Sequence, residues 1–421
     1  METAKNFQIV FVVVAKVIYN IYLHPLAKYP GPKLCAVSSI PVASAQLKGK
    51  LHNFTKKLHD RYGDVVRISP SELSFISAAA WNDIYSRRNG KPALARDKTF
   101  FNDMLVGQDT MTMADDAKHA RLRRAMNPAF APRALAAQEA IIQKSITLFL
   151  NRVHDLSVQG SLVDLRLWYN YVTFDVIGDL AFGDSFGCLE NSKYHDWVTF
   201  VLDYFYASTL LQVVHRFRPL NRLFAAMIPA SLADKRKKHE EMALEKVRRR
   251  IKRGAERPDF THPLIEAEKD GTISTSELEH QASILILAGS ETTSVALTSA
   301  THLLLENPKA LAKLVKELRN SFRSESEVDV LSIHKLHYLQ AVIQETLRLY
   351  PPITNGFPRQ PYDENAVVDG HLIPYGVSPR IKFFNFHKTD LSRLLSTLVI
   401  GVRIGARKTS QNRMNSSRSA G

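Results

Sequence analysis

The sequence is poor in cysteine. Its 421 residues contain two, Cys35 and Cys188, and neither lies in the C-terminal half of the chain. Two cysteines cannot supply the disulfide framework of a small secreted protein, so the sequence favours a reducing compartment. Acidic residues are also scarce, 41 against 56 lysine and arginine residues, which gives a formal net charge of +15. That charge is compatible with nucleic acid, an anionic membrane surface or an acidic protein as a partner.

Long hydrophobic runs are few, and the clearest one lies at the N-terminus. It extends from Phe7 to Leu23 and is interrupted by Lys16 and Asn20. The run is short for a membrane span, but no small-residue cleavage site follows it, and proline, glycine and lysine residues mark its exit. We therefore expect residues 1–24 to be an uncleaved membrane anchor. The alternative is a hydrophobic helix that lies on the domain or on the membrane surface.

Strand signals are also few. The stretches "VVRIS" and "ELSFIS" flank a turn at Pro70 and predict two strands, and the Asp-Gly pair in "AVVDGHLIPYG" predicts a hairpin. Residues 88–114 lack periodicity and are expected to form a long loop. Most of the chain from residue 115 to residue 305 has helical periodicity, and two amphipathic helices follow. These patterns predict a mainly α fold with a minor β-sheet region, in one domain over residues 25–378.

The segment "ASILILAGSETTSVALTSATHLLL", residues 282–305, is an apolar helix with an unusual centre. The small pair Ala288-Gly289 precedes Glu291 and Thr292. A glycine inside a helix costs about 1 kcal/mol relative to alanine, and a buried carboxylate is costly unless it is partnered. Close packing, in which small residues admit a neighbouring helix, explains such a pattern when it stands alone. We expect the whole segment to form one long central helix.

Other patterns are ambiguous when they are taken singly. Glu345 and Arg348 in "QETLRLYPP" are three residues apart on one helix face, within reach of an ion pair, and a surface salt bridge is the simplest interpretation. His119 and Arg123 in "DDAKHARLRRAMNPAF" also share a helix face and by themselves indicate a basic helix. Residues 234–257 are basic too, but interleaved glutamates favour a solvated helix face over a nucleic-acid stripe.

In combination, and in this order, these stretches resemble the cytochrome P450 family, specifically the membrane-bound fungal type that modifies secondary metabolites. The stretches that match are "HPLAKYPGPKL", "LHDRYGDVVRISPSELSFIS", "HARLRRAMNPAFAPRAL", "AGSETTS" and "QETLRLYPPITNGFPR". The resemblance implies the cytochrome P450-like fold, a haem b cofactor, and NADPH electrons from NADPH-cytochrome P450 reductase. It also implies a haem-thiolate monooxygenase that hydroxylates or oxidises a lipophilic small molecule. The anchor would make it a single-pass protein of the endoplasmic reticulum membrane, with its catalytic domain in the cytoplasm.

The resemblance implies catalytic roles for the centre of the 282–305 segment. Ala288 and Gly289 would leave room for dioxygen over the haem iron. Glu291 and Thr292 would deliver protons, because cleaving the O–O bond needs two protons and a hydroxyl beside an acid can relay them.

The resemblance implies supporting roles for five residues elsewhere. His119, Arg123 and Arg359 would contact the haem propionates, since cationic or hydrogen-bonding donors suit carboxylates. Glu345 and Arg348 would be a buried structural pair near the proximal side of the haem, and such a pair is costly to break from one side.

The resemblance stops before the family's defining residue. That residue is a cysteine thiolate that ligates the haem iron from a loop near the C-terminus, and no cysteine follows Cys188 here. No metal ligand is therefore assigned. Residues 380–421 carry nine lysine and arginine residues and one acid, which adds +8 to the net charge. We expect residues 379–421 to be a divergent, basic, disordered tail, and the chain to be C-terminally truncated or frame-shifted.

Two functions therefore compete. The first is the haem-thiolate monooxygenase of the family. The second is a catalytically inactive product, at most a membrane-tethered binder of lipophilic ligands. A third interpretation, in which the basic tail binds nucleic acid or anionic lipid, is weaker because the excess charge lies mostly where the resemblance ends. No nucleic-acid partner is expected.

Overall fold

The computed structural model describes residues 2–86, 93–97, 100, 110–217, 241–242, 244–254, 257–361 and 366–381. The chain divides into two compact units, each assembled from separate stretches. The first unit comprises Met1–Leu105, Asp203–Arg236 and Ile353–Phe384, and the second comprises Val106–Leu202, Lys237–Pro352 and Asn385–Gly421. The expectation that residues 25–378 form a single domain stays a prediction.

The first unit begins with an apolar helix. α1 spans Glu2–Ile18 and continues into a π-helical turn, η1, over Tyr19–Leu23. Within the described part of the chain, Asn6–Leu23 is the one helix long and apolar enough to cross a membrane. Arg67 donates from Nη1 to the carbonyl oxygen of Asn20 at 2.7 Å, so the end of this helix is held by the first strand.

The main sheet of the first unit contains both predicted strands. β1 (Val65–Ser69) and β2 (Glu72–Phe75) pair antiparallel, with Val65 opposite Phe75. β7 (Ser378–Ile381) pairs parallel with β2 on its other edge. The side chains of β1 and β2 are buried on both faces of the sheet, which is why the strands carry no clean alternation of polar and apolar residues.

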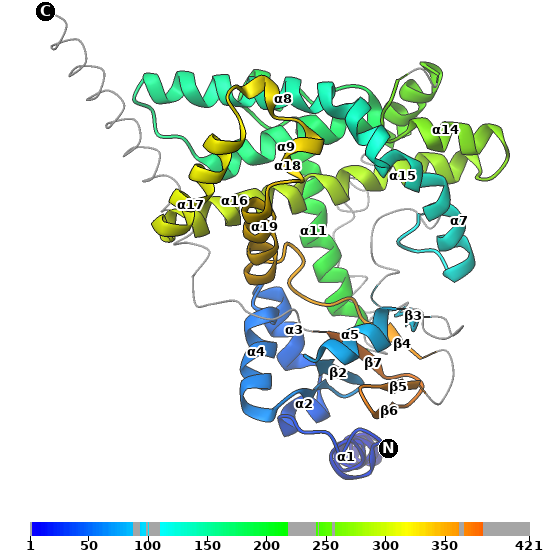
Figure 1. Cartoon of the computed structure of the whole chain (residues 1–421). Helices are drawn as coiled ribbons and strands as arrows, with labels where there is room; N and C mark the ends of the chain where they lie inside the picture. The colour runs from blue at the N-terminus through cyan, green and yellow to red at the C-terminus, as the bar shows by residue number, and fades with distance from the viewer. Residues whose placement is uncertain are drawn as a thin grey trace, which may run out of the picture. The chain divides into compact units, whose positions relative to one another are not determined.

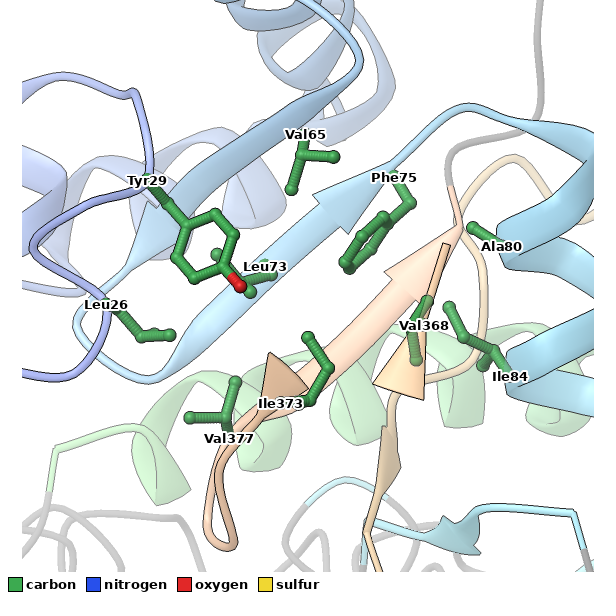
Figure 2. Packing of buried hydrophobic residues seen from close by; sticks show 10 residues of the cluster. All are labelled: Leu26, Tyr29, Val65, Leu73, Phe75, Ala80, Ile84, Val368, Ile373 and Val377. Carbon is green, nitrogen blue, oxygen red and sulfur yellow. The ribbon is translucent and has the colours of Figure 1, made fainter. Parts of the chain in front are cut away.

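The predicted Asp-Gly hairpin is also present. β5 (Ala366–Val368) pairs antiparallel with β6 (His371–Ile373). Asp369 and Gly370 have φ of 51° and 75°, the left-handed conformation that a tight two-residue turn requires. The hairpin contributes to the hydrophobic core of this unit, shown in Figure 2, which is made by Leu26, Tyr29, Val65, Leu73, Phe75, Ala80, Ile84, Val368, Ile373 and Val377.

Short helices complete the first unit. They are α2 (Lys33–Val37), α3 (Ile40–Leu47), α4 (Leu51–Tyr62) and α5 (Ala78–Tyr85), and the longer α11 (Asp196–His215) contributes its later residues. α4 ends at Gly63, whose φ of 91° suits glycine.

Two sequence-based expectations are wrong in the first unit. Ala95–Arg96 forms a strand, β3, that pairs antiparallel with β4 (Arg359–Gln360), inside the segment expected to be a loop. Residues 379–381 belong to β7, so the tail does not begin at residue 379. The rest of the expected tail, 382–421, lies outside the described residues.

A buried ion network explains how β7 tolerates an arginine. Oε1 of Glu72 accepts from Nη1 of Arg216 at 2.7 Å and from Nη2 of Arg380 at 2.9 Å, and the three side chains are at most 10% exposed. Burial alone would raise the pKa of Glu72, but the two guanidinium groups hold it below its ordinary value. Arg380 therefore joins the fold because a carboxylate on the neighbouring strand meets it.

The second unit is helical in its described part (Figure 1). Its helices are α7 (Asp116–Met126), α8 (Pro132–Val158), α9 (Leu165–Phe182), α10 (Cys188–Asn191), α14 (His262–Lys269), α15 (Thr275–Gly289), α16 (Glu291–Glu306), α17 (Pro308–Ser321), α18 (Val330–Ile333) and α19 (His337–Leu349). Of the basic helix predicted over 234–257, residues 244–252 are described and helical.

The ion network gives a stability prediction. Glu72→Gln should destabilise the protein by about 3–5 kcal/mol, because it leaves two guanidinium groups buried without a carboxylate. Glu345→Gln is the matched control: it removes a carboxylate from an exposed ion pair, and such pairs contribute little. Urea unfolding midpoints measure both. Equal losses in the two variants would show that the Glu72 network is not specially stabilising.

Candidate active site

The central helix is interrupted at one residue. α15 ends at Gly289 and α16 begins at Glu291, with Ser290 between them, and Figure 1 shows the two helices end to end. The prediction of one continuous helix over 282–305 is therefore wrong in detail, although both helices lie in the same unit.

Two side-chain hydroxyls bond to backbone carbonyls at the interruption. Oγ of Ser290 donates to the carbonyl oxygen of Ile286 at 2.7 Å, and Oγ1 of Thr292 donates to that of Ala288 at 2.6 Å. Each of these carbonyls would otherwise serve only the backbone N–H four residues later. Such back-bonding competes with the helical hydrogen bonds and bends helices. The acid Glu291 thus lies in the first turn of α16, immediately after a helix break.

Gly289 is required by packing. A Cβ atom built on Gly289 would lie 2.7 Å from Cδ1 and 2.9 Å from Cγ1 of Ile177 in α9. Real Cβ contacts are essentially never that short, so a side chain here would force the Ile177 side chain or the helices to shift. Close packing, the simpler of the two interpretations, therefore accounts for Gly289. Ala288 is exposed, and the role of both residues beside dioxygen stays a prediction.

The carboxyl group of Glu291 is shielded from solvent. Its Oε2 has no hydrogen-bond partner among the described residues. Burial raises the pKa of Glu291, and Arg166 in α9 opposes the shift. Tyr194 lies near Glu291. Burial, together with the nearby Glu291 charge, raises the pKa of the Tyr194 phenol to about 12. An acid with a raised pKa beside the Thr292 hydroxyl holds its proton more tightly than an exposed glutamate does, which suits a group that passes protons.

α7 carries two of the predicted haem contacts. His119 is half-buried and Arg123 is exposed. α7 is fixed against the start of α15 by Arg121, whose guanidinium group donates to both carboxylate oxygens of Glu277 at 2.8 and 2.6 Å. The hydrogen bonds from Arg121 lower the pKa of Glu277 to about 2.

The link between α7 and α15 was not predicted from the sequence, although the capping residues at the start of α15 could be. Ser274 and Glu277 form a capping box at the start of α15, a spacing that can be read directly from "STSE". The partner, Arg121, is 156 positions away, and no local pattern identifies it.

The remaining predicted residues are positioned as follows. Glu345 and Arg348 form a two-bond ion pair in α19, Nε to Oε2 and Nη2 to Oε1, both at 2.6 Å. Their side chains are 55% and 47% exposed, so the expectation of a buried pair is wrong for the structure as described. Arg359 belongs to the first unit, where Nη1 donates to Leu94 O at 3.4 Å. Its placement near His119 and Arg123 stays a prediction.

Neither cysteine fits the role of a thiolate ligand to haem iron. Cys35 and Cys188 are at most 1% exposed. Burial raises the pKa of Cys35 to about 11 and that of Cys188 to about 12, so both are neutral thiols at physiological pH. The nearby Asp175 carboxylate further disfavours a thiolate at Cys188. The residues present therefore do not fit a thiolate-ligated haem.

The comparisons with known proteins agree with this architecture. The cytochrome P450 family model matches residues 30–384. The cytochrome P450 monooxygenase astD of Aspergillus oryzae is 60% identical over 358 residues, which cover 85% of this chain and 70% of that protein. Averantin hydroxylase of Dothistroma septosporum is 37% identical over 382 residues, 89% of this chain and 72% of that one.

The fold comparison points the same way. A cyanobacterial structure described as retinoic acid-bound CYP120A1 aligns with a TM-score of 0.63 at 20% identity, covering 79% of this chain and 72% of that one. The chain belongs to the cytochrome P450 family, a family of enzymes, and the two fungal relatives above are named as a monooxygenase and a hydroxylase.

The Gly289 contact makes a second prediction. Gly289→Ala should cost about 1–3 kcal/mol of unfolding free energy, because the added methyl group overpacks the α9–α15 contact. Ile177→Val removes the Cδ1 atom that the methyl group would meet. The double variant should therefore lose less than the sum of the two single losses. Thr293→Ala, at an exposed position of α16, is the control and should change little. Strict additivity in denaturant unfolding would refute the packing explanation.

Proposed function

We propose that this protein has the chemistry of a P450 monooxygenase that hydroxylates or oxidises a lipophilic small molecule in fungal secondary metabolism. The observation that carries the proposal is the acid-hydroxyl pair, Glu291 and Thr292, at a break in the central helix. The pair joins a half-buried acid with a raised pKa to a hydroxyl, which is the combination that proton delivery to an oxygen atom needs. A relative named as an averantin hydroxylase at 37% identity supports the substrate class.

The proposal includes a location and a source of electrons. The apolar helix Asn6–Leu23 supports a single-pass anchor. By analogy with the family, the membrane is that of the endoplasmic reticulum, the catalytic domain is cytoplasmic, and a reductase supplies NADPH electrons to haem b. None of this calls for a nucleic-acid partner.

A specific observation favours a second candidate for the 421-residue chain. Cys35 and Cys188 are buried neutral thiols, and family chemistry depends on a thiolate. The second candidate is therefore a catalytically inactive product, at most a membrane-tethered binder of a lipophilic ligand. The two candidates differ in one property, the presence of a cysteine thiolate on haem iron.

A spectrum of two matched proteins separates the candidates. One is the 421-residue chain, and the other joins residues 1–381 to the corresponding C-terminal segment of astD. Both are expressed with haem supplied, and the reduced carbon monoxide difference spectrum is recorded. We expect a thiolate-type band from the chimera and none from the 421-residue chain.

A control variant and two contrary outcomes show how each candidate could be disproved. A variant with Cys35→Ser and Cys188→Ser should have the same spectrum as the 421-residue chain. A thiolate-type band from the chain that disappears in this variant would disprove the inactive candidate. A folded chimera without the band would count against the monooxygenase chemistry of residues 1–381.

A further inference from the structure

One face of α16 carries a continuous row of polar side chains that begins at Glu291 and extends beyond the site described above. The spacing of three or four residues places them on one side of the helix. Its members are Glu291, Ser294, Thr298, His302 and Glu306. Ser294, Thr298 and His302 are at most 5% exposed, whereas Glu306 is exposed at the end of the helix. We call this row the polar stripe.

Several atoms of the polar stripe are buried without a partner. Oγ1 of Thr298, both ring nitrogens of His302 and Oε2 of Glu291 have no hydrogen-bond partner among the described residues. Leaving one buried polar group unpaired costs about 1–3 kcal/mol. Four such atoms on one helix face would be expensive if the interface were dry. Internal water, which bridges buried polar groups in many proteins, would satisfy them.

Thr298 differs from the other hydroxyl residues around it. Ser290, Thr292 and Thr301 each donate to the carbonyl oxygen four residues earlier, at 2.7, 2.6 and 2.9 Å. Thr298 has no such bond although it is buried. Its hydroxyl is therefore left for a partner in the space beside the helix.

α9, which packs against α16, also carries a buried polar atom without a partner in the described part of the chain. Tyr169 shares a hydrogen bond of 2.8 Å with Thr301, and Ile177 contacts Gly289, so α9 is held against α15 and α16 on both sides of Asn170. Asn170 is 5% exposed, and its Oδ1 has no partner within the described structure. A fifth unpartnered polar atom thus lies in the same helix pair.

We propose that the polar stripe is a hydrated proton path that runs from Glu306 at the protein surface through His302, Thr298 and Ser294 to Glu291. Neighbouring members are one helical turn apart, about 5–6 Å between Cβ atoms, a gap that one bridging water closes. A proton enters one ring nitrogen of His302 as the proton on the other nitrogen leaves toward Thr298. The hydroxyls and waters accept and pass on one proton each, so the intermediate groups keep their charge, while Glu291 becomes neutral and solvent at Glu306 supplies the proton.

The path deepens the proposed function, on which its purpose rests, because Glu291 is the acid of the acid-hydroxyl pair. Electrostatics favour the transfer. Burial lowers the pKa of His302, with Glu306 opposing, and burial raises the pKa of Glu291, with Arg166 opposing. An acid and a base whose pKa values are brought closer together exchange protons more readily. Tyr194 is the other titratable group that interacts with Glu291.

The first test detects the water itself. Nuclear Overhauser cross-peaks between water and threonine methyl groups are recorded on the full chain with labelled threonine. We expect a cross-peak at the Thr298 methyl that is lost in His302→Phe. The Thr301→Val variant is the matched control, because the hydroxyl it removes already has two partners, and it should keep the cross-peak. No water contact at Thr298 in the wild-type chain would overturn the proposal.

The second test measures proton movement. A light-triggered pH jump is followed by isotope-edited infrared spectroscopy of the Glu291 carboxyl group, assigned with Glu291→Gln. Protonation should be slower by about tenfold or more in Thr298→Val and in His302→Phe, and unchanged in Thr301→Val. Thr298→Val is nearly isosteric and serves if His302→Phe does not fold. Equal rates in wild type and Thr298→Val would overturn the path. Neither test needs bound haem, so its outcome is separate from that of the carbon monoxide spectrum.

Discussion

The close approach of α9 and α15 is the constraint on which the centre of the second unit depends. A side chain at Gly289 would meet Ile177 at less than 3.0 Å, so it would fit only if Ile177 or the helices shifted. The helix breaks one residue later, where two hydroxyls bond back to carbonyls. Glu291 therefore starts the next helix with its carboxyl group turned away from solvent. One packing contact thus shapes the environment of the acid that the proposed chemistry needs.

Charge in this protein is organised in internal pairs as well as on the surface. Arg250 and Asp259 form a fully buried two-bond ion pair at 2.6 and 3.0 Å. Glu72 pairs with Arg216 and Arg380 within the first unit. A buried pair of this kind contributes less to stability than its Coulomb attraction suggests, but losing one partner is costly. A one-to-one pair adds nothing to the net charge of +15, so the excess positive charge comes from other residues.

Local chemistry was predictable from the sequence. The stop of α4 at Gly63 and the turn at Asp369-Gly370 depend on backbone conformations that few residues tolerate, so the residue types reveal them. β7 was missed because a strand with Arg380 looks unsuited to burial until Glu72, 308 positions away, is placed beside it. Long-range partners of this kind leave no periodic signal.

In the candidate site, too, local sequence patterns were predictive and the three-dimensional environment was not. Glu291 and Thr292 could be singled out from their spacing and the family resemblance, and the structure adds why the acid is shielded. The helix break at Ser290 was missed because an apolar pattern does not report side-chain bonds to the backbone. The exposure of the Glu345–Arg348 pair was also missed, since the same i, i+3 spacing serves buried and surface pairs alike.

The central claim is that helix packing buries an acid, Glu291, whose pKa is raised. The most direct test is the pH dependence of the unfolding free energy of the wild type and of Glu291→Gln. A raised folded-state pKa means that the folded protein binds the proton more tightly than the unfolded chain. The two proteins should therefore differ least at low pH, where the acid is neutral. The glutamine variant should gain on the wild type as pH rises above the ordinary glutamate value and through the folded-state pKa. A difference that stays flat with pH, or a wild type that gains instead, would contradict the account.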